Sequence, residues 1–214
     1  MPRWLWLLLL GLFLALWWAG RHGDSPMMAS TMTGSGVVTC PLPPAFADSG
    51  QPRQSEVGGM LAPFRLGKAT VSPLAGFSLQ ARVLSRENYS LGRASDYSPT
   101  DLALGWGPMS VPGLAQKLHV TQGGRWYRYG WGGDGPPMAP DQIVRNSANM
   151  HLVPADVAVA RSLERISAGD MVRVDGWLIR IDGDEGWHWQ SSLSREDSGA
   201  GACELVLVCS IQRQ

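Results

Sequence analysis

Two short polar segments hold most of the side chains that could do chemistry. The first runs from Arg145 to His151, and its candidate site residues are Asn146, Ser147, Asn149 and His151. Amide, hydroxyl and imidazole groups this close together can bind a polar ligand or transfer a proton. They can also cap a helix end and satisfy the following turn, because Asn and Ser readily form such local hydrogen bonds. We expect the structural role first and keep all four residues as site candidates.

The second polar segment runs from Ser191 to Glu204 and is rich in hydroxyl groups. Its candidate site residues are Ser192, Arg195, Asp197 and Glu204. Such a loop can bind an anionic or polar ligand. It can equally bond to itself, with Arg195 paired to Asp197 or Glu204. The self-bonded loop is the first expectation, and ligand binding is the alternative.

Nucleophilic catalysis would need a histidine beside a serine or a cysteine. The sequence offers His151 or His188 with Cys203, and His188 with Ser191 or Ser192. None of these residues lies in a local signature such as G-x-S-x-G. We therefore assign no catalytic residue and leave open whether the chain is an enzyme. The histidines are scattered and lack C-x-x-C or H-x-x-x-H spacing, so we expect no metal and no cofactor.

The length and composition of the chain limit the classes of protein to which it can belong. The 214 residues leave room for one hydrophobic core on the usual scale of domain size. Lys+Arg and Asp+Glu are balanced at 18 each, so the chain lacks the basic footprint expected of a nucleic-acid-binding protein. The 26 Gly and 15 Pro, with only 17% charged residues, indicate many turns and short strands.

The N-terminal segment predicts a membrane anchor. Trp4 to Gly20 contains no charged residue and has Trp near both ends, as in the aromatic belts of a bilayer. As a helix it would be about 25 Å long, at the short end for a transmembrane span. A cleaved signal peptide is the alternative, although the residues after the apolar run are bulky where small ones are needed. We predict an anchor at residues 1–20, and the flanking charges weakly favour a periplasmic C-terminal domain.

A linker and one domain are predicted to follow. Residues 21–75 are rich in Pro, Gly and Ser and show little periodic hydrophobicity, so we predict a flexible tether there. Residues 76–214 form the predicted domain. Alternation or short apolar runs predict strands at 77–84, 102–106, 118–121, 125–131, 170–175, 177–181, 187–190 and 203–211.

Helical signals are fewer. Residues 112–118 fit one or two turns, 140–148 fit a helix with Pro at its first turn, and 157–166 fit a helix that Asp156 caps. Gly176 predicts a bulge or sharp bend between two strands. The predicted class is mostly β (α+β), a small OB-like or SH3-like barrel with two short helices, preceded by one transmembrane helix.

Cysteines and aromatic residues leave two further questions open. Cys203 and Cys209 lie about 20 Å apart on one predicted strand and cannot bridge each other. Either one of them pairs with Cys40 in an oxidising compartment, or both are small buried hydrophobic residues, which we expect. The aromatic residues form either a stacking platform for a ligand or part of the core. They are Trp106, Trp126, Tyr127, Tyr129, Trp131, Trp177, Trp187 and Trp189.

Three segments together resemble a family of uncharacterised bacterial membrane-anchored proteins with no assigned activity. These segments are residues 101–110, 147–152 and 191–204, and the resemblance spans about residues 77–212. It implies a bacterial source and one intact domain, with a periplasmic location, and it assigns no site residue.

These observations lead to one expected function and one alternative. We expect a single-pass inner-membrane protein whose periplasmic domain binds or scaffolds an envelope protein or glycan. Its partners are then the bilayer and that protein or glycan, with no nucleic acid. The alternative is an envelope hydrolase that uses Ser147–His151 and Ser191–Glu204. A hydrolase requires His151 or His188 within hydrogen-bond reach of a Ser, Cys or carboxylate.

Overall fold

The computed structural model describes residues 40–44, 50–194 and 203–214. All of them belong to the unit formed by residues 37–214. The anchor predicted at residues 1–20 lies outside the described residues. Within the described ranges, no helix combines the length and apolar character that a membrane span requires.

Strands dominate the structure, which confirms the mostly β prediction. A two-stranded hairpin pairs β5 (Thr121–Gly123) with β6 (Trp126–Arg128). The main sheet has eight strands. They are β1 (Arg53–Ser55), β2 (Phe64–Leu66), β3 (Ala69–Asn88), β4 (Thr100–Gly105), β7 (Ser147–Pro154), β8 (Met171–Asp182), β9 (His188–Gln190) and β10 (Glu204–Arg213).

Three α-helices and three 3-10 turns connect these strands in the described residues. The helices are α3 (Pro112–Ala115), α4 (Pro140–Arg145) and α5 (Val157–Glu164). The 3-10 turns are η2 (Arg93–Asp96), η3 (Gly107–Ser110) and η4 (Asp184–Gly186). Helices predicted at 112–118, 140–148 and 157–166 are therefore confirmed, each with an earlier end.

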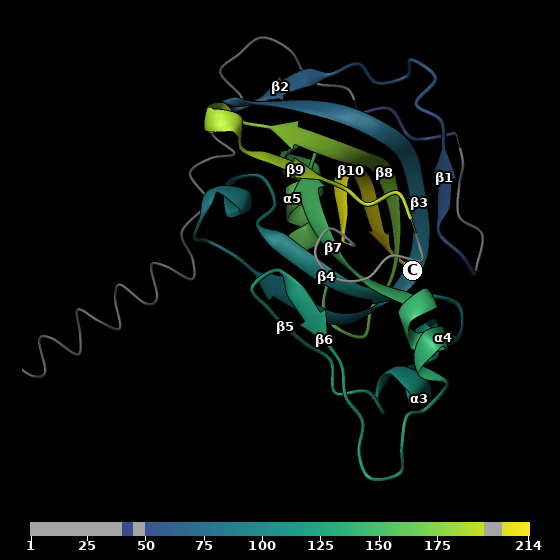
Figure 1. Cartoon of the computed structure of the whole chain (residues 1–214). Helices are drawn as coiled ribbons and strands as arrows, with labels where there is room; N and C mark the ends of the chain where they lie inside the picture. The colour runs from purple at the N-terminus through teal and green to yellow at the C-terminus, as the bar shows by residue number, and fades with distance from the viewer. Residues whose placement is uncertain (1–39, 45–49, 195–202) are drawn as a thin grey trace, which may run out of the picture. The chain divides into compact units, whose positions relative to one another are not determined.

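The strand pairings close into a ring. β3 pairs with both β4 and β8, and the path β3–β4–β7–β10–β8 returns to β3. Only β7 and β10 run parallel among the ring pairs that the structure describes. The 20-residue β3 makes this closure possible, since one stretch of it faces β8 and its last residues face β4. Figure 1 shows β3 curving around the other strands.

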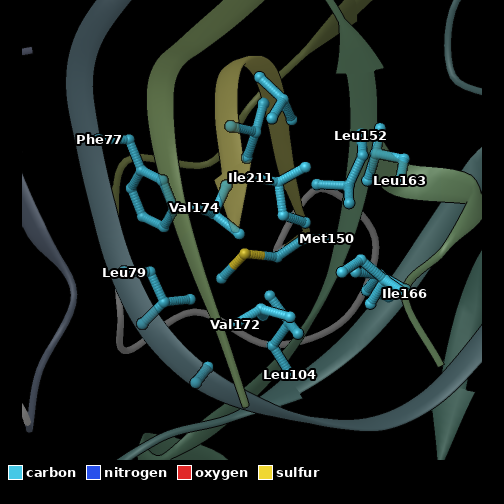
Figure 2. Packing of buried hydrophobic residues seen from close by; sticks show 14 of the residues in the cluster. Phe77, Leu79, Leu104, Met150, Leu152, Leu163, Ile166, Val172, Val174 and Ile211 are labelled. Carbon is cyan, nitrogen blue, oxygen red and sulfur yellow. The ribbon is translucent and has the colours of Figure 1, made fainter. Parts of the chain in front are cut away.

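The interior of the ring is a hydrophobic core. All five ring strands contribute apolar side chains at alternating positions, and Met150 lies at the centre of the labelled group in Figure 2. α5 adds Val159 and Leu163, and Ile166 follows just after it. This helix begins where predicted, because the carboxylate of Asp156 accepts a hydrogen bond from the backbone N–H of Val159 at 2.8 Å.

A second core lies on the opposite face of the strands. Leu205 and Leu207 of β10 pack there with Trp177 and Ile179 of β8, and Leu61 is buried against them. The indole N–H of Trp177 donates to the carbonyl of Pro41 at 2.8 Å. The described residues before β3 (40–44 and 50–68) are therefore part of the fold.

This segment corrects two predictions. The flexible linker was predicted to run to residue 75, whereas β1, β2 and the start of β3 lie before that residue. A few apolar side chains, such as those of Leu61 and Phe64, are enough to pack this segment against the second core on the outer face of the sheet. Cys40 forms a disulfide with Cys209, with a Cα–Cα distance of 5.3 Å. Cys209 is thus not the simple buried hydrophobic residue that we expected.

At Gly176 a bulge or a sharp bend was predicted, and the pairing of β8 with β10 is irregular there: Val208 pairs with Gly176 and Ser210 with Asp175, so β10 has an extra residue between them. β8 itself continues through Gly176 as one strand from Met171 to Asp182. A Cβ atom at Gly176 would collide with the backbone carbonyl of Leu207 on β10. Glycine is needed here for the close approach of two strands.

β7 was not among the predicted strands, and neither were the short strands β1 and β2. The predicted helix extended to residue 148, but α4 ends at Arg145 and β7 begins at Ser147. The predicted strands at 118–121 and 125–131 shrink to β5 and β6.

Candidate functional site

A cluster of polar side chains lies on the outer face of β4 and β7. Asp101 and His151 are direct partners in the antiparallel register of these strands, and Asn149 lies two residues before His151 on the same face. Their neighbours Leu102, Met150 and Leu152 point into the ring core. Strand alternation therefore puts the polar residues together outside the ring.

Asp101 is the centre of this cluster. Its side chain is fully buried, and one carboxylate oxygen accepts from Nη1 of Arg125 at 2.7 Å. The other oxygen faces Nδ1 of His151 at 2.9 Å and accepts from Nδ2 of Asn149 at 3.2 Å. A carboxylate paired with a guanidinium can only accept hydrogen bonds, so the bond network assigns a proton to Nδ1 of His151. In the neutral imidazole, Nε2 is then a hydrogen-bond acceptor.

The β5–β6 hairpin brings Arg125 to Asp101. Its two turn residues, Gly124 and Arg125, have φ values of 59° and 70°. Positive φ at both central residues is the type I′ turn that matches strand twist in a hairpin. A residue with a side chain in this region costs about 1–2 kcal/mol. Two contacts hold Arg125 there: its backbone N–H donates to the hydroxyl of Tyr89 at 3.1 Å, and its carbonyl accepts from Asn149 at 3.2 Å.

Aromatic rings enclose the charged groups. The guanidinium carbon of Arg125 lies 4.0 Å from the ring centroid of Tyr89 and 5.5 Å from that of Trp189. The ring centroids of His151 and Trp189 are 4.8 Å apart. Tyr89 and Trp189 are half-buried, and the side chain of Arg125 is 19% exposed. We call this set the polar–aromatic site; it consists of Tyr89, Asp101, Arg125, Asn149, His151 and Trp189.

Three polar atoms in or beside this site have no hydrogen-bond partner among the described residues. They are Nη2 of Arg125, Oε1 of Gln122 and Nε2 of His151. Gln122 belongs to the same network, because its Nε2 donates to Oδ1 of Asn149 at 2.6 Å. Nη2 of Arg125 and Oε1 of Gln122 are closed off from solvent, so a ligand at the surface of the site does not reach them.

The predicted candidates of the first polar segment divide into two pairs. Asn149 and His151 join the polar–aromatic site. Asn146 and Ser147 instead close the end of α4, which is the structural role expected for this segment. Nδ2 of Asn146 donates to the carbonyl of Gln142 at 2.7 Å, and Oγ of Ser147 donates to that of Ile143 at 2.6 Å. The hydroxyl of Tyr127 lies 3.0 Å from Oγ of Ser147, and burial raises the pKa of Tyr127 to about 12.

The second polar segment is described only in part. Oγ of Ser192 accepts from the backbone N–H of Ser194 at 3.0 Å, which fits a loop bonded to itself. Glu204 is buried at the start of β10. Arg195 and Asp197 lie outside the described residues, so their predicted roles stay predictions.

The predicted site residues did not include Asp101, Arg125 or Tyr89. A usable signal was present in residues 148–152, where Ala, Met and Leu alternate with Asn149 and His151. This period of two predicts a strand with a polar face, and such a face needs polar partners on a neighbouring strand.

The histidine pairs proposed for catalysis are not formed by the described residues. Within residues 40–44, 50–194 and 203–214, neither His151 nor His188 has a Ser or Cys side chain in hydrogen-bond reach. His188 is exposed, with Nδ1 3.4 Å from the carbonyl of Gly186. In the same ranges, no group of three or more His, Cys, Asp or Glu side chains is placed to hold a metal ion.

No protein-family model, curated protein or solved structure matches the chain. Its function must therefore be argued from the polar–aromatic site and the fold that positions it.

Proposed function

We propose that this chain is a membrane-anchored binding or scaffolding protein of the bacterial envelope. Residues 1–20 hold it in the inner membrane, and the domain that begins near Cys40 lies in the periplasm. The polar–aromatic site is its binding surface for an envelope glycan or protein. The observation that carries this proposal is the grouping of half-buried aromatic rings around a buried charged cluster on the outer face of β4 and β7.

The strand order supports an OB-like barrel as the scaffold, in preference to the SH3-like alternative. In chain order the five ring strands are β3, β4, β7, β8 and β10. Around the ring, the first strand pairs with the second, the second with the third, and the third with the fifth. The fifth then pairs with the fourth, which pairs back with the first. α5 connects the third and fourth strands. OB folds bind ligands on the face of their second and third strands, flanked by the loops after the first and fourth strands. Here β4 and β7 carry Asp101 and His151, and the two flanking segments carry Tyr89 and Trp189.

The disulfide supports the proposed compartment. Disulfides persist in oxidising surroundings such as the periplasm and are rare in the bacterial cytosol. Cys40–Cys209 joins the segment nearest the predicted anchor to β10. The weak charge bias of the anchor and the disulfide thus favour the same location.

One observation favours the hydrolase alternative. Asp101 holds Nδ1 of His151 and leaves Nε2 unbonded, which is how a carboxylate orients a histidine that acts as a base. Binding remains the better-supported function, because the described residues place no Ser or Cys nucleophile beside Nε2.

In-cell crosslinking of the full chain, followed by purification, tests the binding proposal. We expect the native chain to be recovered with an envelope protein or with cell-wall glycan. A Trp189→Ala variant should lose this partner, since Trp189 forms one side of the site. Trp131→Ala is the matched control, because Trp131 is 39% exposed and lies outside the site. If the native chain recovers no envelope partner above background, the proposal fails.

A further inference from the structure

We propose that the outer face of the β5–β6 hairpin docks on an anionic phospholipid bilayer, the membrane that holds the predicted anchor. This outer hairpin face consists of His119, Thr121, Trp126 and Arg128, with Lys117 at its base. The inference rests on the proposed membrane anchoring of the chain. It assigns a second membrane contact to a surface that is not part of the polar–aromatic site.

The strand pairing of the hairpin places these side chains on one face. Thr121 of β5 pairs with Arg128 of β6, and Trp126 lies two residues before Arg128 on the same side. The register continues outward, since the backbone N–H of His119 donates to the carbonyl of Gly130 at 2.9 Å. Paired residues and alternate residues of two strands share a side, so His119 lies on the same side as Thr121.

The opposite, inner face of the hairpin packs on β7. Nε2 of Gln122 donates to Oδ1 of Asn149 at 2.6 Å, and the hydroxyl of Tyr127 lies 3.0 Å from Oγ of Ser147. The four residues of the outer face are exposed instead, and Trp126 is 39% exposed. The inner face therefore holds the hairpin in place, and the outer face is left accessible to a partner.

The charge of this segment favours an anionic partner. Residues 102–133 contain no Asp or Glu, and their cationic residues are Lys117, Arg125 and Arg128. Arg125 is paired with Asp101. Lys117 and Arg128 are exposed and form no ion pair with any residue that the structure describes. The outer hairpin face thus presents uncompensated positive charge.

An exposed tryptophan beside two cations is a combination that membrane interfaces favour. The amphipathic ring of Trp is enriched at the level of the lipid headgroups, where its apolar body and its polar N–H are both accommodated. Each Lys or Arg close to an anionic bilayer contributes a preference of about fivefold for that surface. Trp126, Lys117 and Arg128 together therefore suit an anionic lipid surface.

The predicted anchor places such a surface within reach. Residues 21–39 separate the anchor at residues 1–20 from Cys40, and a chain of this length spans at most about 65 Å. A folded unit of this size is about 40 Å across, so each of its faces can reach the bilayer. Docking is then an intramolecular step, for which a small contact suffices. A soluble acidic polymer lacks this advantage.

Quenching of tryptophan fluorescence by brominated lipids tests the inference. The full chain is reconstituted in vesicles of brominated phosphatidylcholine, either alone or mixed with phosphatidylglycerol as the anionic lipid. We expect stronger quenching in the anionic vesicles, and we expect Trp126→Phe to remove this additional quenching. Trp131→Phe is the matched control, because Trp131 is also 39% exposed but its ring continues the row of Tyr127 and Tyr129 on the inner face.

A double variant tests the two cations. Lys117→Gln combined with Arg128→Gln should lower the ratio of docked to free hairpin about thirtyfold, and the additional quenching should be lost. Lys68→Gln combined with Arg161→Gln removes the same charge from exposed positions outside the hairpin, so it should keep that quenching. High salt should also weaken the docking of the native chain, because salt screens exposed charges.

The outcomes separate this inference from the proposed function. If the chain enters the vesicles but Trp126→Phe is quenched like the native chain, the docking inference alone fails. Equal effects of Trp126→Phe and Trp131→Phe overturn it too, because the contact is then not confined to the outer hairpin face. If the chain does not enter the vesicles, the proposed anchoring fails together with the docking.

Two further outcomes bear on the chemistry of the partner. If the quenching of Trp126 is the same with and without phosphatidylglycerol, the assignment of an anionic partner is wrong. If lipid does not quench Trp126 but polygalacturonate shifts its fluorescence, the partner is a soluble acidic polymer and the lipid inference fails.

Discussion

Asp101 supports both charged neighbours in the polar–aromatic site, so its charge should matter for stability. It is fully buried and holds Arg125 and His151 through its two oxygens. Asp101→Asn leaves the guanidinium of Arg125 in a largely buried position without a compensating charge. We expect the free energy of unfolding to fall by about 3–5 kcal/mol, as when one partner of a buried ion pair is removed. Urea unfolding followed by Trp fluorescence measures this change.

Asp134→Asn is the matched control for that variant. Asp134 is exposed in the loop that precedes α4, and surface substitutions of this kind change stability little. If Asp101→Asn unfolds at the same urea concentration as the control, the cluster makes no net contribution to stability.

At the level of individual residues, the sequence predicted part of the polar–aromatic site. Asn149 and His151 stood out because polar types gathered in a short segment. Asp101 did not, because it precedes an apolar run and its importance depends on a strand 50 residues away in the sequence. Arg125 was hidden in an aromatic strand, since nothing local shows that the turn directs its side chain toward Asp101. Partners brought together by long-range strand pairing are not visible in the spacing of residues.

Among the strands, the contact between β8 and β10 gives the sharpest prediction. Gly176→Ala would place a methyl group against the backbone carbonyl of Leu207, and neither strand can move without breaking the ring pairings on its other side. We expect a loss of more than about 4 kcal/mol, or failure to fold. Thermal unfolding followed by circular dichroism measures it.

Gly123→Ala serves as the comparison on another strand. No atom lies within 4 Å of the position that its Cβ would take, so we expect little change. If the Gly176→Ala variant has the same melting temperature as the native chain, β8 and β10 can move apart more easily than their packing implies.

Strands and helices differed in how well they could be predicted. The alternation of β3, the capping of α5 by Asp156 and the apolar run of β10 are local signals, and all three elements formed. β7 was missed because a proline-started helix pattern ran into it and Asn, Ser and His suggested a turn. β1 and β2 are three residues each, too short to show a period, and they exist because β3 offers them an edge.

For the folded unit as a whole, the disulfide is the largest single constraint. Cys40 and Cys209 are 169 residues apart in the sequence, so the bond closes nearly the whole described chain. Restricting the unfolded state by a loop of this length is worth about 5 kcal/mol in the chain-entropy model. We expect Cys209→Ala, or reduction with dithiothreitol, to lower the free energy of unfolding by up to that amount. Urea unfolding with and without reductant measures it.

Cys203→Ser is the control, because Cys203 is not part of this bond. That variant should keep its sensitivity to the reductant, and Cys209→Ala should lose it. If the native chain unfolds identically with and without the reductant, the disulfide makes no contribution to its stability.

The same disulfide determines the path of a mechanical force through the folded domain. Suppose that the chain before Cys40 is anchored in a membrane and that the polar–aromatic site is bound to an immobile partner. A force between the two is then applied to the domain at Cys40. It crosses the covalent link to Cys209 in β10 and passes to β7, the parallel neighbour that carries His151. β1 and β2 lie inside the closed loop and carry no tension, so they cannot be peeled away. The shortest mechanical path from tether to ligand is therefore one disulfide and two adjacent strands.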